Sequence, residues 1–298
     1  MRRVLIVILL VAASAVPAAA QGTLRVAYAG SMGVVMDHYL GPEFAKRNEV
    51  TFQGIGQGSF ALARLIAGEQ LQADVFVAIT PGPIMVLVKA ALIEQAVPVA
   101  STAMVIAYSP KSRFAPAFAG GEPWWQVLQS SGLRFGRTDP KIDPQGRNII
   151  FTMLLAERYY HQPGLAGRIL GGFLNHAQIF TEASVLSRLE AGQLDASSGY
   201  ESAVVSRHLP FVRLPDEINL SNPAMEKSWY STVHFALPGP TGKPHDVHTE
   251  PLVFYAAALK NASHPTLARK FVAFLLSPAG QALFGKVGYG PPKGGPIR

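Results

Sequence analysis

Two serines in this chain follow glycine-rich segments that lead from an apolar run into a helical pattern. Ser59 ends the segment Gly54-Ile55-Gly56-Gln57-Gly58-Ser59, and Ser31 lies in Gly30-Ser31-Met32-Gly33. A serine at the N-cap of a helix offers its hydroxyl beside unpaired backbone amides and the positive end of the helix dipole. Such a turn can bind an anion, although most glycine-rich turns before helices are only structural.

A loop with two Asp-Pro steps, residues 136–147, is the most unusual polar segment of the sequence. Asp143 fits a helix N-cap, with Pro144 at the first helical position. Capping explains this one Asp-Pro step but not the length of the loop. A ligand role for part of the loop is therefore an alternative with about equal weight.

Two further features lie at predicted strand ends in the second half of the chain. Glu182-Ala183-Ser184-Val185 offers the free amides of a third strand-to-helix turn, and Tyr200 ends a strand with a hydroxyl that can donate to an anion. Each feature alone is more often structural. Together with the two serines and the Asp143 loop, they predict a cleft between two lobes, lined by hydroxyls and amides.

The elements that must hold these residues alternate between strand and helix. Apolar strand patterns at 24–29, 50–53 and 73–78 are each followed by a helical pattern, which predicts an α/β fold with a mostly parallel sheet. Ligands bind beyond the carboxyl ends of such strands, where Ser31 and Ser59 both lie.

Length and composition allow two lobes, because the chain has 298 residues of which 49% are hydrophobic. The Pro- and Gly-rich segment 109–123 indicates where the chain enters the second lobe. The segment that follows 211 is predicted to return it to the first. We therefore assign residues 21–103 and 212–298 to lobe 1, and residues 104–211 to lobe 2.

The first twenty residues read as a cleavable secretory signal. Arg2 and Arg3 precede an apolar run, residues 4–11, which leads to Ala18-Ala19-Ala20. The chain has no cysteine, which excludes disulfides and a lipidated cysteine anchor. We expect a periplasmic protein that is not lipidated. Its net charge is +7, but basic residues do not cluster with aromatic ones, so nucleic acid is not an expected partner.

Enzyme and cofactor alternatives fit the sequence less well. Ala29-Gly30-Ser31-Met32-Gly33 approaches a nucleophile elbow, which would make the protein an exported serine hydrolase, but Ala29 stands where that motif needs glycine. Glycines 54, 56 and 58 match neither a dinucleotide fingerprint nor a P-loop, so no cofactor is expected. The pair in His245-Asp246-Val247-His248 lies in a loop pattern and is more often solvated than metal-bound.

Several segments, taken in order, form a more specific pattern. They are Ala29-Gly30-Ser31, Gly56-Gln57-Gly58-Ser59, Ala73-Asp74-Val75-Phe76, Thr138-Asp139-Pro140 with Asp143-Pro144, Ala156-Glu157-Arg158-Tyr159-Tyr160, and Leu214-Pro215-Asp216-Glu217-Ile218-Asn219-Leu220. In this pattern the chain resembles the periplasmic solute-binding proteins of molybdate and tungstate ABC transporters, in particular their tungstate-binding branch. The resemblance covers nearly all of the chain after the signal.

The resemblance implies a two-lobed periplasmic binding protein of type II. Each lobe would be a mixed, mostly parallel sheet flanked by helices, and two crossing strands would join lobes that close over one oxyanion. The ligand-binding residues that it implies are Ser31, Ser59, Asp143, Ser184, Val185 and Tyr200, with Gly30 and Gly58 beside the serines. Asp143 corresponds to a carboxylate that reaches the metal atom of the anion in the tungstate-binding branch.

A carboxylate at such a site has a chemical purpose, because six-valent molybdenum or tungsten can accept extra oxygen ligands whereas sulfur in sulfate cannot. The chain departs from the family at three positions. Gly199 stands where we expect a second carboxylate, and Arg147 and Asn148 stand where the family usually has Tyr and Arg. Glu201 or a shifted loop could compensate, Arg147 could face the anion, or the ligand could be sulfate, phosphate or another small anion.

The resemblance also implies partners. We expect a small oxyanion, either molybdate or tungstate, and an ABC transporter permease in the inner membrane that receives it. A monomer is expected, with neither a cofactor nor a resident metal ion.

Overall fold

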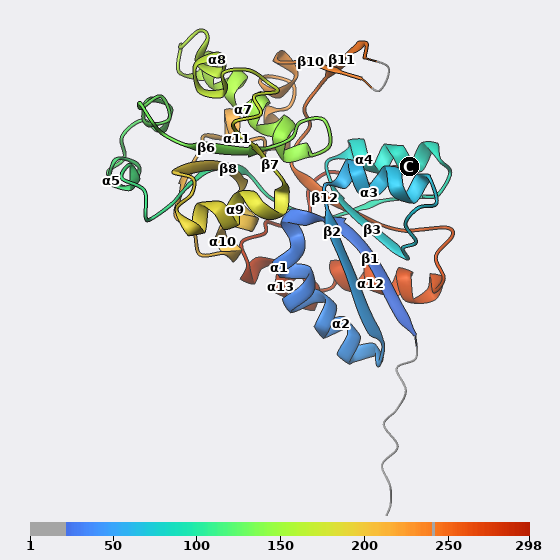
Figure 1. The fold of residues 1–298 in the computed structure, drawn as a ribbon. Coiled ribbons are helices and arrows are strands. Elements are labelled where there is room, and N and C mark those ends of the chain that lie inside the picture. Colours follow the sequence, from blue (N-terminus) through green and yellow to red (C-terminus); the bar gives the residue numbers. More distant parts are fainter. Residues whose placement is uncertain (1–21, 240–241) are drawn as a thin grey trace, which may run out of the picture.

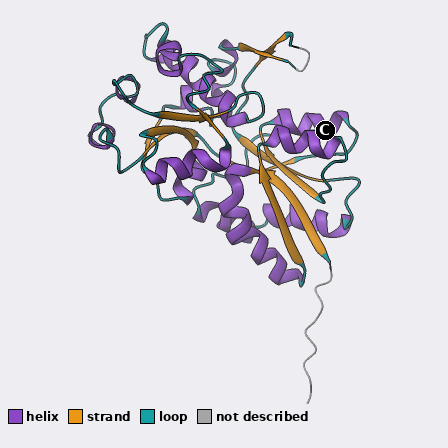
Figure 2. Cartoon of the chain, in the orientation of Figure 1, coloured by secondary structure: helices purple, strands orange, loops and turns teal. Residues whose placement is uncertain are grey.

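The computed structural model of the protein describes residues 22–239 and 242–298. The chain forms two α/β lobes, each built on a five-stranded sheet (Figure 1). Figure 2 shows the strands grouped inside each lobe, with helices around them. This confirms the predicted two-lobed architecture. The predicted signal, residues 1–20, lies outside the described residues, and within those residues no helix has the length and apolar character needed to cross a bilayer.

Lobe 1 contains a mixed sheet with the strand order β2-β1-β3-β12-β4. Its strands are β1 (Thr23–Ala29), β2 (Thr51–Gln57), β3 (Val75–Ile79), β4 (Val97–Ser101) and β12 (Val253–Ala258). Strand β1 pairs in parallel with β2 and β3, and β12 is antiparallel to β3 and β4. Every residue of β3 is buried, as expected for a central strand that helices cover on both faces.

The helices of lobe 1 follow its strands closely. They are α1 (Gly33–Val35), α2 (Gly41–Asn48), α3 (Ser59–Ala67), α4 (Pro81–Lys89), α12 (Pro265–Leu276) and α13 (Pro278–Lys286), with the short helical turns η1 (Gly30–Met32) and η2 (Met36–Leu40). Helix α3 buries Leu62, Ala63 and Ile66 at helical spacing. The first residues of η1 and α3 therefore lie at the carboxyl ends of β1 and β2.

Lobe 2 contains the sheet β7-β6-β8-β5-β9. Its strands are β5 (Met104–Tyr108), β6 (Phe135–Thr138), β7 (Ile179–Phe180), β8 (Ala196–Tyr200) and β9 (Phe211–Arg213). Its helices are α5 (Ala115–Ala119), α6 (Trp124–Val127), α7 (Pro144–Tyr159), α8 (Leu165–Leu170), α9 (Glu182–Ala191) and α10 (Glu201–Ser206). The parallel strands β6 and β8 both end at the edge that faces lobe 1.

The glycine-rich stretch belongs to strand β2 and is not the turn that we predicted. Strand β2 runs to Gln57, so Gly54 and Gly56 lie inside it. A Cβ atom on Gly54 would lie 2.5 Å from Asp37 Oδ1, and one on Gly56 would lie 2.7 Å from Tyr28 Cε2. The glycines are needed because the ring of Tyr28 packs flat against this strand.

The second crossing between the lobes lies later than we predicted. Strand β9 still pairs with β5 of lobe 2, and Phe235 packs on Phe151 of α7 with ring centroids 4.8 Å apart. The chain returns to lobe 1 near Leu252, whose amide donates to Leu220 O and whose carbonyl accepts from Thr102 N. The described residues between 212 and about 250 therefore pack with lobe 2.

The boundary was misplaced because the Pro-rich segment that begins near Leu214 folds into short elements and does not cross directly to lobe 1. It contains α11 (Asp216–Asn219), the turns η3 (Pro223–Met225) and η4 (Tyr230–Thr232), and the hairpin of β10 (Phe235–Pro238) and β11 (Pro244–Val247), which projects from lobe 2 in Figure 1. Helix α11 packs on α7. Such short elements depend on tertiary contacts that local sequence patterns do not show.

Candidate anion-binding site

A cleft of about 620 Å³ separates the lobes at the carboxyl ends of their parallel strands. Residues of both lobes line it, among them Gly30, Gly58, Asp143, Glu182, Ser184 and Arg188. A smaller hollow of about 60 Å³ adjoins it, lined by Ser31, Gln145 and Glu182. Glycine 30 and Glu182 line both spaces, so the two spaces meet at these residues.

The two serines of lobe 1 present buried hydroxyls. Ser59 is the first residue of α3, with Gly58 as the N-cap, and Ser31 lies inside the turn η1, so neither serine is itself the predicted N-cap. Among the described residues, the Ser59 hydroxyl has no hydrogen-bond partner, and the Ser31 hydroxyl lies beside the Glu182 carboxylate. A buried hydroxyl without a partner costs about 1–3 kcal/mol, which a bound ligand would recover.

The two glycines beside these serines allow lobe 2 to approach closely. A Cβ atom on Gly30 would lie 2.6 Å from Glu182 Oε2, and one on Gly58 would lie 3.2 Å from Ile142 O. The amide of Ser31 donates to Glu182 Oε1 across the cleft at 2.7 Å. The lobes are therefore in contact at the site.

Asp143 caps α7 as predicted, and its carboxylate also lies in the cleft. Its Oδ1 accepts from the amide of Gln145 at 2.9 Å, and the residue is buried. Burial raises the pKa of Asp143 to about 6, although the Gln145 amide and the charge of Arg147 act in the opposite direction. No salt bridge to Asp143 forms within residues 22–239 and 242–298, so its carboxylate keeps acceptor capacity for a ligand.

Glu182 at the start of α9 brings a second carboxylate to the cleft lining. We expected this carboxylate at the position before Tyr200. Burial, and then the negative charge of Asp143, raise the pKa of Glu182 well above its usual range. The position before Tyr200 cannot carry an acid, because a Cβ on Gly199 would lie 2.7 Å from Val204 Cγ2. The sequence places an acid in the first turn of α9, which helix-dipole stabilisation alone would explain, so the sequence did not single out Glu182 as a residue of the cleft.

Glu201 and Arg147 have partners away from the cleft lining. Glu201 accepts from Arg213 Nη2 at 2.6 Å. Arg147 donates from Nε to Pro140 O at 2.7 Å, and its guanidinium lies 4.1 Å from the ring centre of Phe60 in lobe 1. Burial lowers the pKa of Arg147 to about 10, so it stays charged at neutral pH. Arg147 therefore joins a loop of lobe 2 to helix α3 of lobe 1.

The turn at the start of α9 does not offer the amides that we expected from it. The amides of Ser184 and Val185 both donate to Thr181 O, at 3.0 and 3.1 Å. The Ser184 hydroxyl also bonds within this turn, to Thr181 O at 3.2 Å. The first helical turn closes on Thr181, and α9 contributes the side chain of Glu182 to the site instead.

Tyr200 lies fully buried at the end of β8. Asn148 Nδ2 donates to its hydroxyl oxygen at 3.0 Å, which leaves the hydroxyl proton free to be donated. Burial, and then the charge of Asp143, raise the pKa of Tyr200 well above its usual range. The phenol therefore stays protonated and can act as a donor beside the two carboxylates.

Taken together, the site combines neutral hydroxyl donors with two carboxylates and no paired cation among the described residues. In the same part of the chain, no group of three or more His, Asp or Glu side chains could hold a metal ion. The hydrogen bonds at Ser31 involve Glu182 and Tyr289, and none involves a histidine. This arrangement can bind a compact solute that accepts hydrogen bonds and tolerates carboxylates.

Two α/β lobes with a cleft between them are the architecture of the periplasmic-binding-protein fold, and solved structures agree on this fold. The periplasmic molybdate-binding protein of Azotobacter vinelandii matches with a TM-score of 0.66 at 15% identity, over 91% of this chain and 100% of that one. The sulfate-binding protein SubI of Mycobacterium tuberculosis matches with a TM-score of 0.59 at 15% identity, over 90% and 86%. At such identities, these likenesses show the fold alone.

The sequence gives the family directly. Residues 24–290 match the model of the bacterial extracellular solute-binding proteins, and the chain belongs to this family. It is 29% identical to the molybdate/tungstate-binding protein WtpA of Pyrococcus abyssi, over 88% of this chain and 82% of that protein. It is 30% identical to a putative ABC transporter molybdenum-binding protein of Haloferax volcanii, over 72% and 67%. The resemblance inferred from the motifs is confirmed.

Proposed function

We propose that this protein captures molybdate or tungstate in the cleft between its lobes and delivers it to an ABC transporter permease in the inner membrane. The observation that carries the proposal is the pair of neighbouring carboxylates in the cleft, buried Asp143 and half-buried Glu182, beside the hydroxyls of Ser31, Ser59 and Tyr200. The names of the relatives from Pyrococcus abyssi and Haloferax volcanii point to the same anions.

The chemistry of the site favours these anions over sulfate. Two carboxylates repel a sulfate dianion. No coordination bond offsets this repulsion, because the sulfur of sulfate does not add oxygen ligands. A six-valent molybdenum or tungsten centre can accept a carboxylate oxygen from each side chain. The anion's own oxygens would then accept hydrogen bonds from Ser31, Ser59 and Tyr200.

The proposal includes the remaining expectations from the sequence. The protein would be exported to the periplasm by the signal at residues 1–20, without a lipid anchor, and would act as a monomer without a cofactor. It assigns no catalytic step to Ser31. The +7 charge of the chain would steer anions toward the protein.

Isothermal titration of the purified protein with molybdate, tungstate, sulfate and phosphate tests the function. We expect tight binding of molybdate and tungstate and weak or no binding of sulfate and phosphate. Absence of heat with the first two anions would refute the proposal, and tighter binding of sulfate or phosphate would assign the cleft to that anion instead.

A further inference from the structure

Gln145 is a buried polar side chain at the edge of the candidate site. It follows Asp143 and Pro144 in the first turn of α7, and only 2% of its surface is exposed. A glutamine amide can accept hydrogen bonds through Oε1 and donate two through Nε2. Because burial of an amide without partners is costly, the partners of each atom indicate its role.

The oxygen of this amide is held in place from two strands. Thr138 Oγ1 on β6 and Ser198 Oγ on β8 each donate to Gln145 Oε1 at 3.2 Å. In this orientation of the amide, the two hydroxyls donate to Oε1 and Nε2 points away from them. The side chain of Gln145 is therefore oriented before any ligand binds.

The nitrogen of the same amide is left for the site. Among the described residues, no acceptor bonds to Gln145 Nε2, while the residue lines the 60 Å³ hollow that it shares with Ser31 and Glu182. Ser31 contributes its buried hydroxyl to this hollow, beside the Glu182 carboxylate. A volume of this size has room for a few waters or for part of a small anion. Two donors, Gln145 Nε2 and the Ser31 hydroxyl, therefore face the same small space.

We propose that Gln145 is a direct ligand residue, whose Nε2 donates to an oxygen of the bound oxyanion on the side that Ser31 and Glu182 enclose. This rests on the proposed function and extends it. A neutral donor fits here, because it stabilises the oxygens of the anion without pairing with Asp143 or Glu182. An arginine or lysine at this place would instead neutralise the carboxylates that select the anion.

The test compares Gln145→Met with the wild type. Methionine keeps the length of the side chain and removes the donor. We expect the affinity for tungstate in calorimetry to fall about tenfold or more, as for a lost hydrogen bond to a charged group. Thr152→Val is the matched control, since Thr152 is buried on the same helix with an unpartnered hydroxyl and does not line the cleft. It should bind like the wild type.

A second measurement separates contact from support. In ¹⁵N spectra of the wild type, the side-chain amide of Gln145, assigned by its loss in Gln145→Met, should shift when tungstate is added. Wild-type affinity in Gln145→Met, or an amide resonance that does not move, would overturn the proposal while leaving the function intact. A wild type that binds neither molybdate nor tungstate would overturn both.

Discussion

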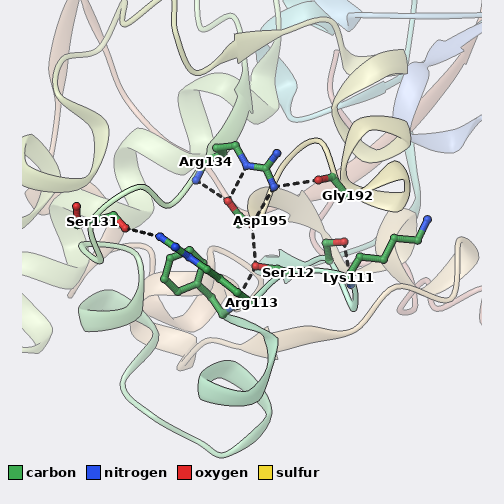
Figure 3. Close-up of polar contacts among 9 residues, drawn as sticks. Lys111, Ser112, Arg113, Ser131, Arg134, Gly192 and Asp195 are labelled. Atoms are coloured by element: carbon green, nitrogen blue, oxygen red, sulfur yellow. Dashed lines mark hydrogen bonds and ion pairs between the residues drawn. The ribbon is translucent and has the colours of Figure 1, made fainter.

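Lobe 2 holds two buried carboxylates near the opposite ends of strand β8, and their surroundings differ completely. Asp195, just before the strand, accepts from the amide and Nε of Arg134, both at 2.9 Å, and from Ser112 Oγ at 2.8 Å (Figure 3). Asp143, near the other end, accepts the Gln145 amide, lies beside the Thr138 hydroxyl, and has no ion-pair partner in the described part of the chain. Both residues are only 4% exposed to solvent, and Asp143 is packed more deeply than Asp195.

The pKa values follow from these surroundings. Burial alone would raise the pKa of Asp195, but the hydrogen bonds from Arg134 and Ser112 lower it to about 2. At Asp143 burial prevails, and the pKa is raised to about 6. A carboxylate that the protein satisfies by itself stabilises the fold, whereas one that the protein leaves unsatisfied is available to a ligand.

Removal of both site carboxylates should have the largest effect. In the variant Asp143→Asn with Glu182→Gln, we expect the affinity for tungstate to fall at least about a hundredfold, which is roughly 3 kcal/mol. Unfolding of the ligand-free protein in urea should show equal or greater stability, because two neighbouring carboxylates without ion-pair partners are gone. Unchanged tungstate affinity would contradict a role of these carboxylates in binding.

Substitution of the carboxylate at the other end of β8, Asp195→Asn, should lower the stability of the protein without changing the site. Loss of charge-assisted hydrogen bonds from Arg134 and Ser112 should lower the free energy of unfolding by about 2 kcal/mol. Tungstate affinity of the folded variant should stay within about twofold of the wild type, since Asp195 lies away from the cleft. Weakened binding with unaltered stability would reverse the roles that we assign to the two ends of β8.

The comparison also explains how far the sequence could predict this molecule. The strand–helix order of lobe 1 was predictable, because hydrophobic periodicity is a local property. Asp143 and Tyr200 were predictable as candidates because polar residues at strand ends meet at one edge of a sheet. The return of the chain to lobe 1 was misplaced, since short elements such as α11 are stabilised by contacts with α7 and β5 that are distant in sequence.

Glu182 and Gln145 could not be found in the same way. Each stands in the first turn of a helix, where its residue type has an ordinary local explanation. Their roles depend on contacts distant in sequence, with Ser31 for Glu182 and with Ser198 for Gln145. Local patterns show where a helix begins, but not which side chain of its first turn contacts distant residues.

The contributions of Asp143 and Asp195 to the free energy of unfolding should change with pH in opposite directions. The pKa of Asp143 is raised in the folded state from 3.8 to about 6, so its contribution to stability is present below pH 4 and is lost as the pH rises through 6. Asp195 has a lowered pKa, so its contribution is present above pH 4 and is lost as the pH falls toward 2. The shift of Glu182 has the same sign as that of Asp143.

Ligand-free wild type should therefore lose stability relative to Asp143→Asn between pH 4 and 6.5. The expected difference is on the order of 1–3 kcal/mol, because a shift of one pKa unit corresponds to about 1.4 kcal/mol. Urea unfolding at several pH values measures it. Parallel curves for the two proteins over this interval would show that Asp143 keeps an ordinary pKa.

The smallest effect concerns two cation–π contacts, one between the lobes and one inside lobe 2. Arg147 lies 4.1 Å from the ring centre of Phe60 across the cleft, and Arg158 lies 4.0 Å from that of Trp229 within lobe 2. Only the first contact requires the lobes to be closed. A double-mutant cycle of Arg147→Met and Phe60→Leu should give a coupling of about 0.5–1 kcal/mol in the affinity for tungstate.

The matched cycle of Arg158→Met and Trp229→Leu should show coupling of similar size in the free energy of unfolding and none in the affinity for tungstate. The difference between the cycles follows from thermodynamic linkage, because a contact can alter the affinity only if it differs between the open and closed states. A coupling in affinity near zero for Arg147 and Phe60 would mean that their contact persists when the cleft opens. Arg147 would then only hold the loop of Asp143 in place, through its hydrogen bond to Pro140 O.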